Sequence, residues 1–287
     1  MSDHVFVVGV PRSGTTLLQE ILSTKANIAL CPETHFFSTL IHKGVKKHIK
    51  HLVPADTDDK LRQLSKILKS GKIFGMLWIN WAEQIDLDKV MENFAKTDRA
   101  LRDLFDQIIK EYARGKGASR GGEKTPSHLF HVGTLVDWFP ECRVIHILRD
   151  PRALLLSEMN KDIKPDYFFT KSNPMYNVGL FFWVAVGWWL AIHLHERYEK
   201  KYPENYMMLK NESLVLNPEA KVKAICDFIG IDWKEDMAEL PPMVNTSFQG
   251  DTSHNPMERW KTLLPKKYVF LLNLTLRRHL KKHGYLD

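Results

Sequence analysis

The sequence is poor in cysteine, with Cys31, Cys142 and Cys226 in 287 residues. The three lie far apart, none forms a C-x-x-C pair, and an odd count argues against a disulfide framework. A reducing compartment is the simplest interpretation. The first residues, MSDHVFVVGV, place an aspartate and a histidine before a short apolar run, which is not the pattern of a signal peptide. We therefore expect a cytoplasmic protein whose first segment is a β-strand.

Acidic residues are also in short supply. The chain has 34 Asp and Glu against 41 Lys and Arg, a net charge of +7 at pH 7. This surplus suits a polyanionic ligand or an acidic surface, and a merely basic soluble protein is the alternative. Hydrophobic residues make up 44%, and 15 Gly with 14 Pro give no sign of disorder. We expect one domain over residues 1–287, with no nucleic-acid partner.

Long uncharged runs are rare. One of them, VGLFFWVAVGWWLAIHL at residues 178–194, tests whether the chain is soluble. It is a little short for a bilayer span and continues into the charged HERYEKKY, so we expect a buried core helix. Trp183, Trp188 and Trp189 leave peripheral membrane contact as the alternative.

Apolar runs and amphipathic segments alternate along the chain. Strands are expected at residues 4–10, 142–148 and 206–210. Helices are expected at residues 16–25, 98–115, 217–230 and 265–284. Continuous apolar strands that alternate with helices indicate a parallel sheet covered on both faces. The sequence therefore predicts a single-domain α/β fold with a P-loop-type parallel sheet.

Three segments stand apart from this alternation. Residues 43–72 are expected to form an insertion with surface helices, and residues 115–122, GKGASRGG, a flexible approach to the next motif. Residues 161–177 are expected to form a loop on the acceptor side.

The most informative absence is that of a lysine. The stretch VFVVGVPRSGTTLLQEIL has the frame of a nucleotide phosphate-binding loop, with Gly9 and Gly14 correctly spaced, but Thr15 takes the position of the usual lysine. Backbone N–H groups and the helix N-terminus would face the anion, and Thr15 and Thr16 add hydroxyl donors. Arg12 supplies a cation that can fork two oxygens of one group. The loop indicates a short 5′ anion rather than a triphosphate, and a glycine turn without a ligand is the alternative.

A second stretch, VIHILRDPRALLLSEM, carries another pair of anion-binding side chains. Arg149 ends an apolar strand, and Pro151 begins a helix. Ser157 lies two turns into that helix, and its side chain tilts back toward the helix N-terminus. Arg149 and Ser157 can therefore grip one phosphate, although an arginine at a strand tip is by itself usually a surface charge.

Together the two stretches resemble the sulfotransferases that use 3′-phosphoadenosine-5′-phosphosulfate. In that family a P-[RK]-[ST]-G-[ST]-T loop, here PRSGTT, holds the 5′-phosphosulfate, and an arginine followed eight residues later by serine holds the 3′-phosphate. The resemblance implies that this nucleotide is the donor, that adenosine 3′,5′-bisphosphate is the product, and that no metal is needed. It also implies a set of donor-binding residues: Arg12, Ser13, Gly14, Thr15, Thr16, Arg149 and Ser157.

Further segments are similar to the bacterial and tyrosylprotein branch of the family: CPETHFF, GEKTPSHL, NESLVLNPEAKVKAICDFIGIDW and ERWKTL. The chain departs from the family at Asn211-Glu212-Ser213, where a Tyr-Glu pair is common, and it lacks the G-x-x-G-x-x-K segment of the cytosolic branch.

The resemblance also implies catalytic residues. Glu33 takes the position of the general base, and Lys124, with Arg12, that of the cation beside the transferring sulfuryl group. If residues 33–35 are extended, His35 faces the same side as Glu33 and is an alternative base, a substrate contact or an orienting group. Lys124 can instead be a structural partner of Glu123.

Two other classes of protein stay open. One is a P-loop kinase that uses NTP and Mg²⁺, with Asp150 as a metal ligand, and the other is a nucleotide-binding module without activity. For the sulfotransferase, the expected acceptor is a hydroxyl of a glycan or glycolipid. A small molecule, a lipid or a protein tyrosine is the alternative acceptor.

Overall fold

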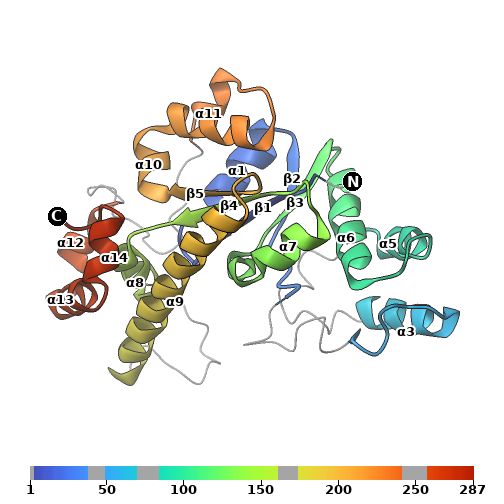
Figure 1. Cartoon of the computed structure of the whole chain (residues 1–287), viewed down its shortest axis with the longest axis horizontal. Coiled ribbons are helices and arrows are strands. Elements are labelled where there is room, and N and C mark those ends of the chain that lie inside the picture. Colours follow the sequence, from blue (N-terminus) through green and yellow to red (C-terminus); the bar gives the residue numbers. More distant parts are fainter. Residues whose placement is uncertain (1–2, 38–48, 70–83, 161–173, 241–256) are drawn as a thin grey trace.

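Five strands form one parallel sheet in the computed structural model, which describes residues 3–37, 49–69, 84–160, 174–240 and 257–287 (Figure 1). The strand order is β2-β3-β1-β4-β5, and every pairing is parallel. The strands are β1 Val5–Gly9, β2 Ile28–Cys31, β3 Arg120–Lys124, β4 Arg143–Leu148 and β5 Tyr206–Lys210. The predicted parallel α/β fold is confirmed.

Helices cover both faces of the sheet. On one face lie α1 (Thr15–Lys25), α10 (Asn211–Leu216) and α11 (Pro218–Ile229) (Figure 1). On the other lie α6 (Leu101–Gly115), α7 (Val132–Trp138), α8 (Pro151–Met159) and α9 (Pro174–Lys201). The other helices in the described part of the chain are α3 (Asp58–Lys69), α5 (Leu87–Phe94), η1 (Pro126–His131), η2 (Glu235–Ala238), α12 (Arg259–Leu263), α13 (Lys266–Thr275) and α14 (Arg277–Lys282).

The central strand β1 shows why two cores form. Val5 and Val7 belong to the apolar cluster shared with α1 and α11, whereas Phe6 and Val8 belong to the cluster on the opposite face. Successive side chains of a strand point to opposite faces, so a continuous apolar run buries residues on both sides.

Strand β3 contradicts the flexible segment predicted at residues 115–122. Its sequence, RGGEK, has no apolar side chain, so the hydrophobic pattern gives no signal for a strand. A Cβ at Gly122 would lie 1.9 Å from the backbone oxygen of Val5, and one at Gly121 would lie 2.7 Å from Ile109. The two glycines therefore allow a strand to pass between β1 and β2 directly beneath α6.

The C-terminal helix predicted over residues 265–284 is wrong as a single element. It is divided into α13 and α14 at Leu276, which is buried. The Thr275 hydroxyl donates a hydrogen bond to the Leu271 carbonyl at 2.8 Å, and such back-bonding is known to bend helices.

Two other helix ends differ from the prediction. Helix α6 begins at Leu101 rather than near Asp98, because the Asp103 carboxylate accepts from the Ala100 N–H at 2.9 Å. Asn217 does precede α11 and Pro218 occupies its first turn, but the Asn217 side chain makes no cap hydrogen bond.

The predicted insertion at residues 43–72 is partly described. Helix α3 lies within it and buries Leu64 and Leu68, so it packs on the domain rather than lying free on the surface. The rest of that segment beyond residues 49–69, and residues 161–173 of the predicted acceptor-side loop, lie outside the described residues.

The segment predicted to be a buried core helix is buried on one face only. In α9, Val184, Trp188 and Ile192 are buried, whereas Phe182 and Trp189 are exposed. Its segment Met175–Lys201 is long enough to cross a membrane and contains an 18-residue window with a mean hydropathy of 1.5, yet 39% of that window is buried inside the protein.

Three histidines lie near one another: His146 in β4, His195 in α9 and His283 directly after α14. The His146 Nδ1 lies 2.6 Å from the Tyr206 hydroxyl, which is 3.3 Å from His195 Nδ1. The His195 and His283 rings are 5.8 Å apart. Burial, with added repulsion from His195 and His283, lowers the pKa of His146 from 6.5 to about 3.

Acid is therefore expected to destabilise the fold before its carboxylates titrate. The pKa of His146 is lower in the folded than in the unfolded state, so the unfolded state binds more protons and stability is lost as pH falls from about 6.5 toward 3. At pH 5 the loss from His146 alone is about 2 kcal/mol. Urea unfolding at pH 5 and 7.5 measures it. The difference should shrink in His146→Gln, and an unchanged difference would contradict the assignment.

Candidate active site

The phosphate-loop segment joins β1 to α1. Gly14 has φ 101°, and a Cβ there would lie 2.1 Å from Asn211 Oδ1, so any other residue would be strained and would displace the Asn211 side chain. Arg12 has φ 69°, an unfavourable value for a residue with a Cβ. The loop is thus held in a strained conformation at the position that carries its cation, as is common at functional sites.

Asn211 is a site residue that sequence reasoning left without a role. It begins α10, is 3% exposed, and its Oδ1 occupies the space that a Cβ of residue 14 would need. The signal was the departure from the family at Asn211-Glu212-Ser213. An asparagine packed on the glycine indicates that this position supports the loop.

Arg149, Ser157 and Arg12 lie together at the carboxyl ends of β1 and β4. Arg149 Nη1 donates to the Arg12 carbonyl at 3.0 Å, and Arg12 Nε donates to Ser157 Oγ at 3.0 Å. The two sets of predicted phosphate-binding residues, 137 positions apart in the chain, therefore adjoin.

The same corner contains buried donors without a partner among the described residues. Ser13 Oγ and Arg149 Nε make no hydrogen bond within the described part of the chain. Burial lowers the pKa of Arg149, although Glu212 and Asp150 oppose the effect. An unpaired buried donor is costly, and a charged one more so. An anion that accepts from both groups would remove that cost, so the residues present fit a phosphorylated nucleotide.

Asp150 does not have the free carboxylate that the kinase alternative requires. Both of its oxygens accept from the Arg152 guanidinium, at 2.7 Å and 2.9 Å for the two shortest contacts, and Oδ1 accepts from the Arg152 N–H at 2.8 Å. Its backbone N–H donates to Glu212 at 2.9 Å. Asp150 caps α8 and neutralises a buried arginine, which is a structural role.

Glu33 and Lys124 form a pair beside the loop. Lys124 Nζ donates to Glu33 Oε1 at 2.7 Å, and His35 Nε2 lies 3.4 Å from Glu33 Oε2. Burial raises the pKa of Glu33, but the neighbouring His35 and the charge and hydrogen bond of Lys124 outweigh it and lower the pKa to about 2. Glu33 is therefore ionised at neutral pH.

The sequence suggested that an extended stretch would bring His35 close to Glu33, and the structure shows a different cause. His35 has φ 51° and lies in a turn that follows β2. The turn brings the two side chains together, and the alternation of side chains along an extended strand does not.

Glu123 and Lys124 point to opposite sides of β3, so the alternative pairing between them is wrong. The buried Glu123 carboxylate accepts from the Thr34 hydroxyl at 2.8 Å and the Thr34 N–H at 3.1 Å, and His128 Nδ1 lies 2.9 Å away. His128 Nε2 in turn accepts from the Phe37 N–H at 3.3 Å. Sequence reasoning missed this support, which ties the turn bearing Glu33 to the end of β3.

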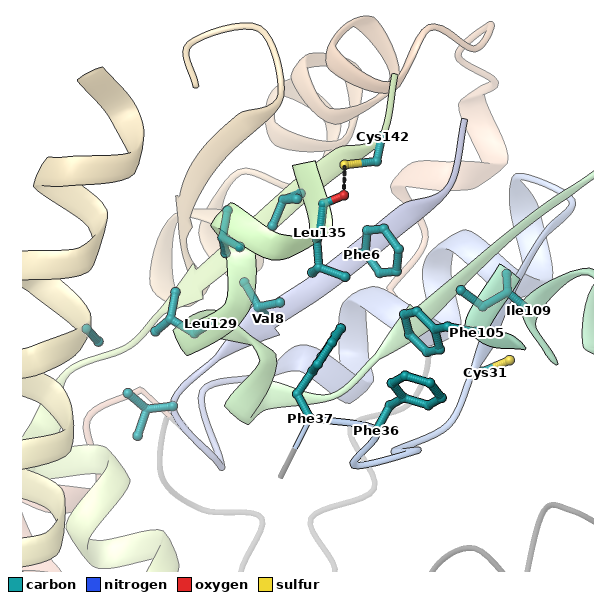
Figure 2. Close-up of a cluster of buried hydrophobic side chains, with 14 of the residues drawn as sticks. Phe6, Val8, Cys31, Phe36, Phe37, Phe105, Ile109, Leu129, Leu135 and Cys142 are labelled. Carbon is teal, nitrogen blue, oxygen red and sulfur yellow. Dashed lines mark hydrogen bonds between the residues drawn. The ribbon is translucent and has the colours of Figure 1, made fainter. Parts of the chain in front are cut away.

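Aromatic packing fixes the far end of the same turn. Phe36 and Phe37 enter the apolar cluster beneath the sheet and contact Phe105 of α6, with ring centroids 4.4 Å and 5.6 Å apart (Figure 2). The turn is therefore held by buried hydrogen bonds on one side and by ring contacts on the other.

These features define a P-loop-type α/β protein with an anion-binding corner and an adjacent carboxylate–lysine pair. Residues 4–235 match the sequence model described as the sulfotransferase family. The chain belongs to that family.

Relatives and solved structures agree with this assignment. The chain is 24% identical over 242 residues to a protein-tyrosine sulfotransferase of Drosophila melanogaster, covering 84% of this chain and 40% of the relative. It spans between 26% and 60% of the length of four curated relatives that it matches.

Two solved structures show the same fold. A sulfotransferase from Alicyclobacillus acidocaldarius aligns with a TM-score of 0.52 at 18% identity, over 100% of this chain and 97% of that one. Mouse sulfotransferase SULT7A1, complexed with PAP, aligns with a TM-score of 0.52 at 15% identity, over 99% and 89%.

Proposed function

We propose that this protein transfers a sulfuryl group from 3′-phosphoadenosine-5′-phosphosulfate to an acceptor hydroxyl. The observation that carries the proposal is the meeting of Arg12, Ser157 and Arg149 at one corner, where Ser13 Oγ and Arg149 Nε are buried donors without described partners. Family membership and the PAP complex of the mouse neighbour support it.

The donor-binding roles follow from this corner. The residues that would hold the 5′ end are Arg12, Ser13, Gly14, Thr15 and Thr16, and those for the 3′-phosphate are Arg149 and Ser157. The loop N–H groups and the start of α1 add a positive potential that favours an anion. When bound, the donor supplies the sulfuryl group and a phosphate leaving group.

Glu33 is the proposed general base and Lys124 the proposed cation at the transferring group. Glu33 is ionised at neutral pH and can accept a proton, but its pKa of about 2 makes it a weak base while Lys124 is bound to it. A lysine that turned from Glu33 toward an incoming anion would raise the basicity of Glu33. The pair thus suits a base that gains strength only when an anion is present.

Donor selectivity tests the assignment most directly. Calorimetry without Mg²⁺ is expected to show adenosine 3′,5′-bisphosphate binding at least tenfold more tightly than ADP or ATP, because only the bisphosphate places separate anions at both sets of residues. Equal affinity for ATP, or a strict requirement for Mg²⁺, would contradict it. Independence of metal stays a prediction until then.

For the acceptor, we propose a hydroxyl of a carbohydrate, as part of a glycan or glycolipid. The support is the likeness to the bacterial branch and the aromatic character of residues 165–176, PDYFFTKSNPMY, most of which lie outside the described residues. The curated protein-tyrosine sulfotransferases among the relatives favour a second candidate, a tyrosine in a protein.

We also propose a reducing, cytoplasmic location, which suits three buried cysteine thiols.

Mass spectrometry separates the two acceptors. Enzyme and donor are incubated with a glycan library and, in parallel, with tyrosine peptides carrying acidic flanks, and each is searched for the mass of one added sulfate. Addition to glycans alone supports the carbohydrate, and addition to peptides alone replaces it with the tyrosine.

A further inference from the structure

The outer sides of α9 and α13 form an apolar surface with no cover among the described residues. Its side chains, which we call the α9–α13 face, are Phe182, Trp183, Val186 and Trp189 of α9 with Phe270 and Leu274 of α13. The exposed fractions of Phe182, Phe270 and Leu274 are 60%, 65% and 59%. Soluble proteins seldom expose so many large apolar groups together unless the surface binds something.

Helix α13 and the short α14 that follows it lie along α9. The rings of Phe181 in α9 and Tyr268 in α13 are 6.1 Å apart, and those of His193 in α9 and His279 in α14 are 5.0 Å apart. Residue numbers therefore rise together along α9 and along the α13–α14 segment. The exposed groups of α9 and α13 lie between these two contact levels. They therefore belong to one surface rather than to two separate patches.

Positive charge borders this surface. From Lys266 to Lys282 the chain has no Asp or Glu, and α9 has no charged residue before Glu196, which is paired with Lys282 at 2.7 Å. Helices α13 and α14 carry five exposed cations that form no ion pair with a described residue: Lys266, Lys267, Arg277, Arg278 and Lys281. Apolar groups with a rim of unpaired cations are complementary to an anionic lipid surface.

The packing of α9 excludes a transmembrane role for this conformation. Trp188, on the inner face, is fully buried and donates from Nε1 to the Arg149 carbonyl at 2.9 Å. Insertion of α9 into a bilayer would break this bond and remove the cover of α8. The helix can therefore lie on a membrane but not across it.

A second copy of the chain is a poorer occupant. In a symmetric dimer the same patch meets itself, so two surfaces that each carry these five cations would be brought together. Like charges at that distance are repelled, whereas anionic headgroups neutralise them.

We propose that the α9–α13 face binds the surface of an anionic bilayer, with Trp183, Trp189 and Phe270 at the headgroup level. The inner side of α9 contacts Arg149 through Trp188, so the bound membrane lies one helix away from the candidate donor site. The proposal does not depend on the sulfuryl-transfer assignment, since vesicle binding is measured without donor or acceptor.

Cosedimentation with vesicles tests it. The full chain is expected to bind phosphatidylcholine vesicles containing 30% phosphatidylglycerol at least tenfold more tightly than pure phosphatidylcholine, and to weaken as salt rises from 0.05 to 0.5 M. Phe270→Ser with Leu274→Ser should lower binding at least tenfold. Leu216→Ser is the matched control, because Leu216 is 64% exposed on α10 at the other face of the sheet and should leave binding unchanged.

A second measurement applies even if the double variant folds poorly. Brominated lipids should quench the tryptophan fluorescence of the wild-type chain, and Trp183→Phe with Trp189→Phe should remove most of that quenching. Absence of binding to the anionic vesicles, equal loss in Leu216→Ser, or quenching that persists in the tryptophan variant would each overturn the proposal. So would a wild-type dimer in sedimentation velocity that the Phe270 and Leu274 substitutions convert to monomer.

Discussion

Replacement of Glu33 by glutamine is expected to lower turnover by roughly 10²–10⁴-fold while donor binding is retained. Glutamine keeps the shape of the side chain and can still accept from Lys124 Nζ, which lies 2.7 Å from Glu33 Oε1, but it cannot take a proton from the acceptor. Steady-state kinetics measure the turnover, and calorimetry with adenosine 3′,5′-bisphosphate measures binding.

His35→Gln is the matched comparison, because His35 Nε2 lies 3.4 Å from Glu33 Oε2 and contributes to its low pKa. If His35 only orients Glu33, this variant should lose less activity than Glu33→Gln or change mainly the acceptor KM. A nearly normal Glu33→Gln enzyme together with an inactive His35→Gln enzyme would transfer the role of base to His35.

Loss of Glu33 must also be separated from damage to the phosphate loop. Thermal melts of Glu33→Gln should show the same stabilisation by the bisphosphate as the wild type, because at a fixed ligand concentration the stabilisation is set by the dissociation constant. If that stabilisation disappears, Glu33 supports the loop and the assignment as a catalytic base is wrong.

Arg149→Ala is expected to weaken binding of the bisphosphate by about 10- to 150-fold. The lost interaction is a charge-assisted hydrogen bond in a buried site, worth about 1.5–3 kcal/mol. Calorimetry with adenosine 3′,5′-bisphosphate and with adenosine 5′-monophosphate distinguishes its role, since the second ligand has no 3′-phosphate and should lose much less.

The comparison with adenosine 5′-monophosphate is needed because Arg149 also has a partner within the protein. Its Nη1 donates to the Arg12 carbonyl at 3.0 Å and so supports the loop at its strained position. Equal losses for both ligands would show that this support is the whole contribution of Arg149, and the 3′-phosphate would need another partner.

Most residues of the candidate donor site come from short stretches of sequence. The P-R-S-G-T-T loop and the Arg149–Ser157 pair each lie within a strand–loop–helix unit, where local spacing sets which groups meet an anion. The apolar runs of β1 and β4 likewise predict buried parallel strands, because both of their faces are covered.

Contacts between distant segments decided the rest. No local pattern marks β3, because its two glycines are required by the backbone of Val5 and by Ile109 of α6 rather than by a periodicity of its own. Glu33 and Lys124 are 91 positions apart, so their pairing, and the low pKa that results, depends on the order β2-β3-β1.

Burial was the other property that composition could not supply. An uncharged segment such as residues 178–194 has the same sequence pattern whether the helix is covered on all sides or on one side. The packing of α9 on α8 and β5 covers only one side and leaves Phe182 and Trp189 exposed. Residue types and local spacing thus decide which chemical groups are available, because backbone geometry acts over a few residues. Which of those groups are buried, paired or left at the surface depends on neighbours that the chain meets only after folding.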